Sequence, residues 1–170
     1  DAGTDGATTF CSNGSSEDLI LSLGGTPQAG GIWSPALASG TGVFDPTVDT
    51  AGTYTYTVGS TCITPSDATV TVSITQAPNT GGVGQTLNTC SNITSLDLFT
   101  GLDGTQDAGN WSDDDATGAL VNNIFNPSTV GVGTYHFTYT VLGTSPCTDG
   151  TSTVTVIVNP LPNAGNPVTI

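Results

Sequence analysis

Four cysteines are the residues of this chain with the most definite chemistry. They stand at positions 11, 62, 90 and 147, and four cysteines can pair in three ways. Because two copies of one sequence pattern each contain two of them, we expect the disulfides Cys11–Cys62 and Cys90–Cys147. Disulfides imply an oxidising space outside the cytosol. The alternative is four reduced, buried thiols in an intracellular protein. A zinc site is disfavoured because no C-x-x-C spacing occurs and the chain has a single histidine.

Acidic side chains form a second set of candidate ligands. The 170 residues include 14 acids and no Lys or Arg, which gives a net charge of -14. Calcium takes six to eight oxygen ligands. We expect that the protein requires no cofactor. Calcium is the ion that these carboxylates could bind. A solvated acidic loop is the alternative, since no calcium-loop spacing is present and the first copy lacks the triple Asp. The candidate ligands are Asp1, Asp5, Asp103, Asp107, Asp113, Asp114 and Asp115.

The remaining polar residues do not predict an enzyme. The chain has no Lys that could act as a base and no repeated Ser/His/Asp set. Its one histidine, His136, aligns with Thr55 on the outward face of a predicted strand. Nucleic acids and anionic membrane surfaces are disfavoured partners, because contact with their phosphates relies on Lys and Arg. No apolar run is long enough to span a membrane.

One aspartate and one tryptophan recur at matching places in the two copies, and a structural role explains each of them. Asp18 and Asp97 are the acids kept in both copies, and we expect each to accept backbone N–H bonds in a turn. Trp33 and Trp111 could stack against a sugar, but their recurrence at the same place favours two core residues.

The pattern that positions these residues occurs twice, about 80 residues apart. Each copy has a Cys-Ser, an Asp-Leu, a Trp-Ser, a Phe-Asx-Pro, a Gly-Thr-Tyr and a second Cys in the same order. Repetition at a fixed period is typical of tandem arrays. We therefore expect one domain over residues 1–78, a second over 79–161, and the start of a third repeat or a linker at 162–170, within a longer polypeptide.

Each copy predicts a set of short β-strands. The clearest are runs of alternating Thr, Val and Tyr that a short turn joins into hairpins: residues 52–58 with 68–75, and 134–141 with 151–158. Shorter strands are expected at residues 8–11, 18–23, 31–34, 42–44, 86–90, 96–99, 110–112 and 119–125. No helix is expected.

These elements predict an all-β fold of two tandem immunoglobulin-like β-sandwich domains with one disulfide in each. A domain of about 80 residues is marginal on its core alone, so the disulfide would have a stabilising role. We expect it to tie the first strand of each domain to the last hairpin, near one end of the sandwich. The predicted core aromatics are Trp33, Trp111, Tyr54, Tyr56, Tyr135 and Tyr139.

Several motifs carry a resemblance to a known family: Ala77-Pro78-Asn79, Cys11-Ser12 with Cys90-Ser91, Trp33-Ser34 with Trp111-Ser112, and Phe44-Asp45-Pro46. On these motifs the chain resembles tandem Ig-like or PKD-like repeats of giant secreted surface adhesins of Bacteroidota, of the type linked with type IX secretion and gliding motility. The resemblance covers nearly the whole chain. It implies no catalytic residues, and it implies that the adhesive tips lie elsewhere in the polypeptide. Asp49-Thr50-Ala51 is similar to a short O-glycosylation motif of the same phylum, so Thr50 is a candidate acceptor.

The sequence thus predicts a structural stalk or filament segment of a large extracellular adhesin, which holds a distal binding region away from the cell surface. Its expected partners are neighbouring repeats of the same polypeptide, and lateral self-assembly into a fibre is a further expectation. Two alternatives stay open: a carbohydrate-binding accessory module of a secreted enzyme, and a calcium-dependent adhesion module. The glycan or protein target of the adhesin is not predicted.

Overall fold

The computed structural model describes residues 1–40, 42–60 and 63–163. Apart from strands it contains three short 3-10 helices in these ranges, and no helix there is long and apolar enough to cross a membrane. The chain divides into two compact units, of which the first comprises Asp1–Ala77 together with Gly143–Thr148. The segment Gly143–Thr148 therefore belongs to the second repeat by sequence and to the first unit by packing.

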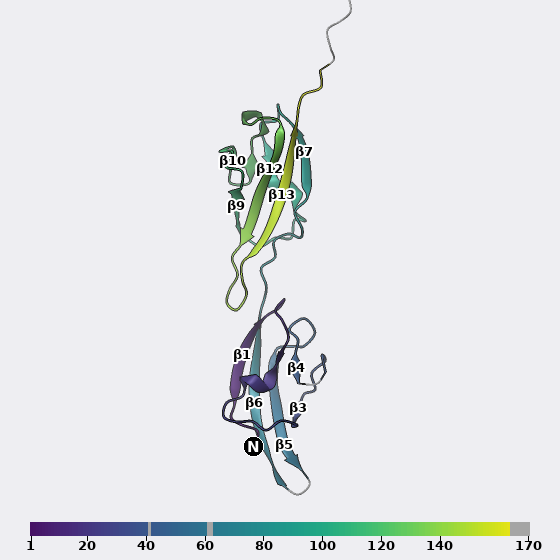
Figure 1. Ribbon diagram of the computed structural model, residues 1–170, viewed down its shortest axis with the longest axis vertical. Helices are drawn as coiled ribbons and strands as arrows, with labels where there is room; N and C mark the ends of the chain where they lie inside the picture. The colour runs from purple at the N-terminus through teal and green to yellow at the C-terminus, as the bar shows by residue number, and fades with distance from the viewer. Residues whose placement is uncertain (41, 61–62, 164–170) are drawn as a thin grey trace, which may run out of the picture. The chain divides into compact units, whose positions relative to one another are not determined.

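The first unit is a sandwich of a four-stranded and a two-stranded sheet (Figure 1). Its elements are β1 (Gly6–Cys11), β2 (Glu17–Asp18), η1 (Leu19–Ser22), β3 (Ile32–Ser34), β4 (Val43–Phe44), β5 (Gly52–Ser60) and β6 (Ile63–Thr75). The larger sheet has the order β1-β6-β5-β3, and β2 pairs with β4 in the smaller one. β1 runs parallel to β6, whereas the other neighbours are antiparallel.

The second unit, Pro78–Leu142 together with Asp149–Ile170, repeats this arrangement. Its elements are β7 (Thr86–Cys90), β8 (Leu96–Asp97), η2 (Leu98–Gly101), β9 (Asn110–Asp113), β10 (Leu120–Val121), β11 (Ile124–Phe125), η3 (Pro127–Thr129), β12 (Gly133–Val141) and β13 (Gly150–Asn159). The sheets have the orders β7-β13-β12-β9 and β10-β11-β8. β7 runs parallel to β13, in the way that β1 runs parallel to β6.

The core of each unit is built from the same residue types. In the first unit Tyr54 of β5 and Val70 of β6 point inward, and Phe44 of the smaller sheet is fully buried with its ring 5.9 Å from that of Tyr54. In the second unit Phe125 is fully buried in the same way, with its ring 4.7 Å from that of Phe137. Alternation of apolar residues with Thr thus directs one face of each hairpin into the core.

A tyrosine near the start of the penultimate strand bonds back to the chain in both units. The Tyr54 hydroxyl donates to the carbonyl oxygen of Thr50 at 2.7 Å, and the Tyr135 hydroxyl donates to that of Gly131 at 2.9 Å. This tyrosine corner is a hallmark of the immunoglobulin fold. Together with the sheet orders, it confirms the predicted all-β fold of immunoglobulin-like sandwiches.

The predicted core aromatics fall into two groups. Three are buried: Tyr54, Tyr56 and Tyr139. Three are partly buried and pack against the core clusters: Trp33, Trp111 and Tyr135. Both tryptophans therefore cover an edge of the core and keep part of the indole exposed.

Two predicted strands, 18–23 and 96–99, continue into 3-10 helix after a short strand. The Asp18 carboxylate accepts the N–H of Ile20 at 3.1 Å, and the Asp97 carboxylate accepts the N–H of Phe99 at 3.0 Å. Each Asp thus caps a short helix, η1 or η2, and a side chain that offers the backbone such a bond competes with strand pairing. The expected turn N–H bonds to these two carboxylates are present, and they end β2 and β8 after two residues.

The strand predicted over residues 119–125 is a tight hairpin of β10 and β11. Val121 pairs with Ile124, so Asn122 and Asn123 form a two-residue turn. Asn122 has a positive φ of 54°, a conformation that Asn adopts more readily than most residues. The Asn122-Asn123 pair, which the strand prediction passed over, is the sequence feature that could have indicated this turn.

Candidate functional site

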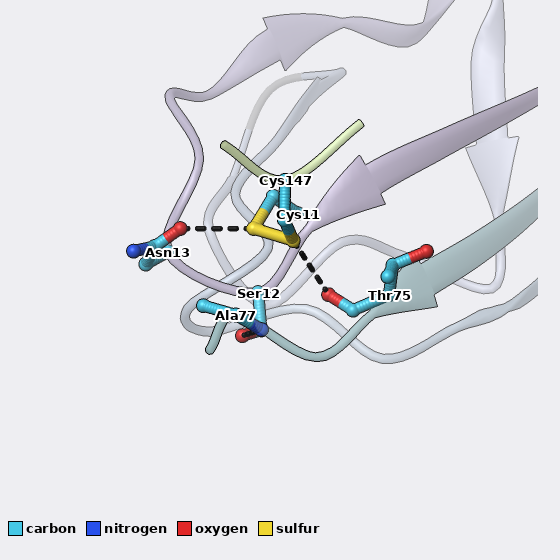
Figure 2. The surroundings of a disulfide bond; sticks show 6 residues. All are labelled: Cys11, Ser12, Asn13, Thr75, Ala77 and Cys147. Carbon is cyan, nitrogen blue, oxygen red and sulfur yellow. Dashed lines mark hydrogen bonds between the residues drawn. A yellow bond between two sulfur atoms is a disulfide. The ribbon is translucent and has the colours of Figure 1, made fainter. Parts of the chain in front are cut away.

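The disulfide bond of the first unit is the feature with the most definite chemistry (Figure 2). Cys11, the last residue of β1, bonds to Cys147; their Cα atoms lie 4.9 Å apart, and 136 positions separate them in the sequence. Cys147 is 7% exposed, and its sulfur lies 3.4 Å from the carbonyl oxygen of Thr75, the last residue of β6. The bond therefore closes at the end of the sheet where β1 and β6 both finish.

Backbone hydrogen bonds position both cysteines. The Ser12 N–H donates to the Thr75 carbonyl at 2.9 Å, and the Ser12 hydroxyl accepts the Ala77 N–H at 2.9 Å. These bonds hold the chain that leaves β1 against the chain that leaves β6. The Cys147 N–H donates to the carbonyl of Thr144 at 2.9 Å, which closes the turn that carries the second cysteine.

The predicted bond between Cys11 and Cys62 is wrong, and the strand geometry gives the reason. Because β1 is parallel to β6, Cys11 lies beside Thr75 at the end of β6. Cys62 lies outside the described residues, but it precedes Ile63, the first residue of β6. A rise of about 3.3 Å per residue places the two ends of β6 about 40 Å apart, whereas the Cα atoms of a disulfide lie about 4.4–6.8 Å apart.

The predicted bond between Cys90 and Cys147 is wrong for the same reason. Cys90 ends β7 beside Asn159, the last residue of β13, whereas Cys147 precedes Gly150, the first residue of that strand. At about 3.3 Å per residue, β13 is about 30 Å long. Cys90 is a free, partly buried thiol. The observed disulfide thus ties the first strand of one repeat to the hairpin loop of the other.

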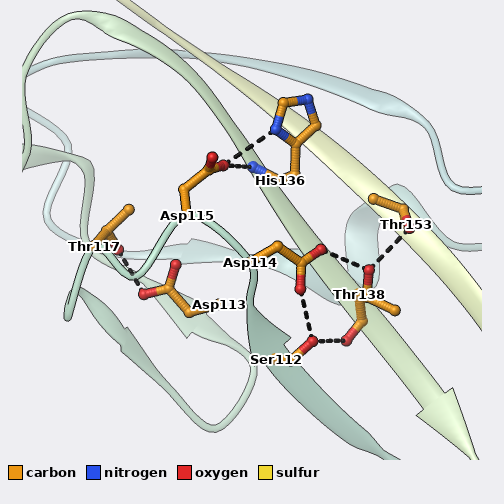
Figure 3. A network of polar contacts seen from close by, with 8 residues as sticks. All are labelled: Ser112, Asp113, Asp114, Asp115, Thr117, His136, Thr138 and Thr153. Atoms are coloured by element: carbon orange, nitrogen blue, oxygen red, sulfur yellow. Dashed lines mark hydrogen bonds and ion pairs between the residues drawn. The ribbon is translucent and has the colours of Figure 1, made fainter.

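The triple Asp, which begins with Asp113 at the end of β9, binds several different parts of its own unit (Figure 3). Asp114 accepts hydrogen bonds from the hydroxyls of Ser112 at 2.8 Å and Thr138 at 2.6 Å. Asp115 accepts the backbone N–H of His136 at 2.6 Å, and the same oxygen lies 3.1 Å from Nδ1 of that histidine. These carboxylates fasten the loop after β9 to the outward face of β12.

Asp113 turns toward the other side of the same loop. Its carboxylate accepts the Thr117 hydroxyl at 2.8 Å and the Gly118 N–H at 3.0 Å. Burial of the Asp113 carboxyl would raise its pKa, but hydrogen bonds from Thr117, Gly118 and Asp115 together hold the pKa below its usual range. The charged carboxylate therefore stabilises this loop at neutral pH.

The remaining candidate calcium ligands each accept a backbone N–H from their own unit. The pairs of acceptor and donor are Asp1 with Gly3, Asp5 with Thr69, Asp103 with Thr105, and Asp107 with Asn79. In the part of the chain that the structure describes, no group of three His, Cys, Asp or Glu side chains is placed to hold a metal. Calcium binding by these residues stays a prediction.

A buried carboxylate lies beside the candidate glycosylation site. Asp49 is 6% exposed and accepts the N–H of Ser39 at 3.1 Å, the hydroxyl of Ser39 at 2.5 Å and the N–H of Asp45 at 2.8 Å. Burial would raise the pKa of Asp49, but bonds from Ser39, Asp45 and Ala38 hold it below its usual range. The neighbouring Thr50 is exposed, and its glycosylation stays a prediction. Nothing in the sequence motif signalled that Asp49 would be buried.

Substitution of Asp49 by Asn should lower the free energy of unfolding of the first unit by about 1–3 kcal/mol at pH 7, because one amide oxygen replaces two carboxylate oxygens as acceptor. Since the folded-state pKa is lowered, this stabilisation is present above the ordinary pKa of 3.8 and is lost as the pH falls through the folded-state value. Urea unfolding at pH 7 and pH 3, followed by Trp33 fluorescence in a Trp111→Phe background, measures both effects. The matched control is the exposed Asp67→Asn; equal losses in the two variants would contradict the role of Asp49.

A shallow groove lies beside each tryptophan. In the first unit a groove of about 480 Å³ is lined by Trp33, Tyr56 and Leu37, and the Trp33 ring lies 4.8 Å from that of Tyr56. In the second unit a groove of about 380 Å³ is lined by Trp111 and Asn122 among others. A partly buried indole beside a groove is a surface on which a sugar ring could stack.

Comparison with known proteins gives no family. No protein-family model matches the chain, and no curated protein matches it. Solved structures that the comparison found include the insect immune protein hemolin, at 14% identity and a TM-score of 0.40 over 69% of this chain. They also include titin domains I67–I69, at 11% identity and a TM-score of 0.39, and human protocadherin-24 EC1-2, at 13% and 0.43, each over 92% of this chain.

The matched structures differ from this chain in length. The chain covers 32% of hemolin, 64% of the titin fragment and 95% of the protocadherin fragment. At these identities and TM-scores, the likenesses give no argument for a shared ligand, partner or activity.

Proposed function

We propose that the chain is a structural segment of a large extracellular repeat adhesin, in which it holds a distal binding region away from the cell surface. The surface proteins that its motifs resemble are those of Bacteroidota. The observation that carries the proposal is the disulfide between Cys11 and Cys147. A disulfide of this kind needs an oxidising space, which agrees with a position outside the cell.

The position of the bond determines how tension would pass along the chain. A pull on the two ends reaches Cys11 from one side and Cys147 from the other. The covalent bond joins these residues directly, so the chain between them, a separation of 136 positions, is not stretched while the bond is intact. Both sandwich cores are built largely from this shielded part of the chain. The bond limits lengthening under load to the pieces outside Cys11 and Cys147, which include β1 and β13, and limited lengthening is what a stalk requires.

The charge of the chain also supports a spacer. With a net charge of -14 and no Lys or Arg, copies repel one another and stay soluble. Lateral assembly into a fibre would have to overcome this repulsion, and neighbouring repeats of the same polypeptide are the partners that we propose first.

The proposal is tested by placing the chain between a surface anchor at its carboxyl end and a reporter peptide at its amino end. Beads that bind the reporter should attach and stay attached under flow, and replacement by a flexible Gly/Ser linker of equal length should make the tether longer and more variable. An oxidised chain that behaves like the linker would contradict the stalk role.

A carbohydrate-binding module is the second candidate, and the grooves beside Trp33 and Trp111 favour it. The same chain on a glycan array separates the two functions. The stalk proposal expects no saturable binding. Saturable binding that is lost in Trp33→Ala or Trp111→Ala, with the far-ultraviolet spectrum unchanged, would establish the carbohydrate-binding function instead.

Reduction of the chain should lower the free energy of unfolding of the first unit by about 2–4 kcal/mol, because the disulfide no longer restricts the unfolded chain. Thermal unfolding followed by Trp33 fluorescence in a Trp111→Phe background, with and without reductant, measures the loss. Cys147→Ser should reproduce it without reductant, whereas Cys90→Ser should melt like the unaltered protein. Equal melting temperatures for the oxidised and reduced chains would contradict a stabilising bond.

A further inference from the structure

We propose that the groove beside Trp33 binds the guanidinium group of an arginine side chain from a partner protein. The site consists of the Asp18 carboxylate, the Trp33 ring and the space that the missing side chain of Gly42 leaves between them. This inference goes beyond the stalk role, because it assigns a ligand to one unit and is tested on that unit alone.

The first observation is that both units contain the same backbone arrangement at this place. Gly42 precedes β4, and its carbonyl accepts the N–H of the first residue of η1 at 3.0 Å. Asn123 precedes β11, and its carbonyl accepts the N–H of the first residue of η2 at 2.9 Å. The residue before each of these helices is the recurring aspartate, Asp18 or Asp97. Gly42 and Asn123 are therefore equivalent positions beside equivalent carboxylates.

The second observation is that a nitrogen donor fills this position in the second unit. The Asn123 side chain donates an N–H from Nδ2 to the Asp97 carboxylate at 2.8 Å, and Asn123 lines the same groove as Trp111. Phe99 packs its ring 5.7 Å from that of Trp111 and covers it further. The second unit thus shows which chemical group fits beside this carboxylate: a planar group with N–H donors.

In the first unit no side chain occupies the equivalent position, because residue 42 is Gly. A Cβ at this position would lie 3.2 Å from Nε1 of Trp33 and 3.8 Å from Oδ1 of Asp18, so a ligand in the same space contacts both residues. Asp18 is exposed and accepts one hydrogen bond in the described part of the chain, from the Ile20 N–H at 3.1 Å. Since an ionised carboxylate offers about four acceptor sites, most of its capacity is left for a ligand.

The chemistry of these groups selects a guanidinium. A carboxylate accepts two parallel N–H bonds from guanidinium, which an ammonium group does not provide in a fixed plane. The planar cation also stacks on an indole, and the attraction acts within about 6 Å of the ring. The Trp33 ring lies 4.8 Å from that of Tyr56, whose hydroxyl donates to the Gln28 carbonyl at 2.7 Å. The aromatic surface is therefore held in place before a ligand arrives, which lowers the entropy cost of binding.

The charge of the chain indicates that the arginine comes from a partner. These 170 residues include no Lys or Arg, so none of their own side chains supplies the cation. A net charge of -14 attracts basic segments of other proteins and speeds their association, whereas a neutral sugar gains nothing from this field. The ligand that fits the groove is thus an arginine-containing segment of a basic protein.

The test titrates the ¹⁵N-labelled, oxidised chain with a blocked Gly-Arg-Gly tripeptide and with the same peptide carrying citrulline, which keeps the shape of arginine without its charge. Salt at about 0.15 M screens general attraction to the acidic chain. We expect saturable shifts of the Trp33 indole N–H and the Ile20 backbone N–H, with no saturable shift of the Trp111 indole. The citrulline peptide should bind about tenfold more weakly, because a hydrogen bond to a charged group contributes more than a neutral one.

Three variants localise the site. Asp18→Asn should weaken binding of the arginine peptide about tenfold, because it removes the charge, while Asn still caps η1 well. Gly42→Asn should abolish binding by placing an amide where Asn123 has one; Asn tolerates the positive φ of 79° at this position better than most residues do. Asp97→Asn, the matched change in the second unit, should leave the binding unchanged.

Four results would overturn the proposal. One is a citrulline peptide that binds as tightly as the arginine peptide, and another is an equal shift of Trp111 and Trp33, which would mean attraction to the acidic chain in general. The third is unchanged binding in Asp18→Asn. The fourth is a neutral sugar that shifts Trp33 when the arginine peptide does not, which would assign the groove to carbohydrate binding. The comparison of the two peptides needs no variant, so it decides the matter even where a substitution destabilises the unit.

Discussion

Pulled from its two ends, the oxidised chain should extend by about 460 Å less than the same chain after reduction. The disulfide keeps the chain between its two cysteines, a separation of 136 positions at about 3.4 Å each, from being extended. While the bond is intact, only the short pieces outside Cys11 and Cys147 can be drawn out. Single-molecule force spectroscopy on the chain held at both termini measures the difference directly. This change in extension is the largest effect that the structure predicts for a single covalent bond.

Two variants make this result specific. Cys11→Ser should give the long extension without any reductant, because the bond cannot form. Cys90→Ser should keep the short extension, because its thiol is free in this chain. An oxidised chain with the full contour length, or one that gains length in two separate steps of about 50–60 residues on reduction, would contradict the bond between the repeats.

Substitution of Phe125 by Ala should lower the free energy of unfolding of the second unit by about 3–5 kcal/mol, because a fully buried ring leaves a cavity in a small core. Its ring lies 4.7 Å from that of Phe137 and 5.8 Å from that of Tyr135, so contacts with two aromatic neighbours are lost. Denaturant unfolding followed by the fluorescence of Trp111, in a Trp33→Phe background, measures the loss in this unit.

Phe44→Ala is the matched variant in the first unit, since Phe44 is also fully buried and its ring lies 4.9 Å from that of Phe10. It should shift the transition seen by Trp33, and Phe125→Ala should shift the one seen by Trp111. If either substitution cost less than about 1 kcal/mol, the ring would not occupy a packed core. If Phe44→Ala and Phe125→Ala moved both transitions equally, the two cores would unfold as one.

The hairpins and the cores could be predicted from the sequence because their signals are local. Alternation of Tyr and Val with Thr determines which side chains of β5 and β12 point inward, and the repeat itself confirms the pattern. Tyr54 and Tyr135 were predicted only as core aromatics, and the structure adds that both form the tyrosine corner. The short elements were harder, because the carboxylates of Asp18 and Asp97 redirect the backbone into 3-10 helices within two residues.

The disulfide could not be found by treating each copy as a closed domain. The predicted pairing assumed that two cysteines in one repeat must meet. The parallel pairing of β1 with β6 places Cys11 at the end of a 13-residue strand whose first residue follows Cys62. Strand length and direction were therefore the missing information, and both depend on a long-range pairing that local patterns do not encode.

The hydrogen-bond partners of most acidic residues could not be predicted from the sequence. Density of charge suggested a calcium site at Asp113 and its neighbours, and calcium binding there stays a prediction. The structure adds that these carboxylates accept hydrogen bonds from Thr117, Thr138 and His136. Asp49, a buried acid, entered the sequence predictions only as part of the candidate glycosylation motif. Backbone N–H groups in turns are the donors that a chain without Lys or Arg has to offer, and their positions follow from the fold.

The most direct measurement is a map of the disulfides in the purified, unreduced chain. Trypsin has no cleavage site, because the chain has no Lys or Arg, so digestion with pepsin at low pH, which also suppresses thiol exchange, is the method of choice. Mass spectrometry should find a peptide pair that joins Cys11 to Cys147, and Cys90 as a free thiol in the monomer. Peptide pairs that join Cys11 to Cys62 and Cys90 to Cys147 would contradict the structure and the proposals built on it.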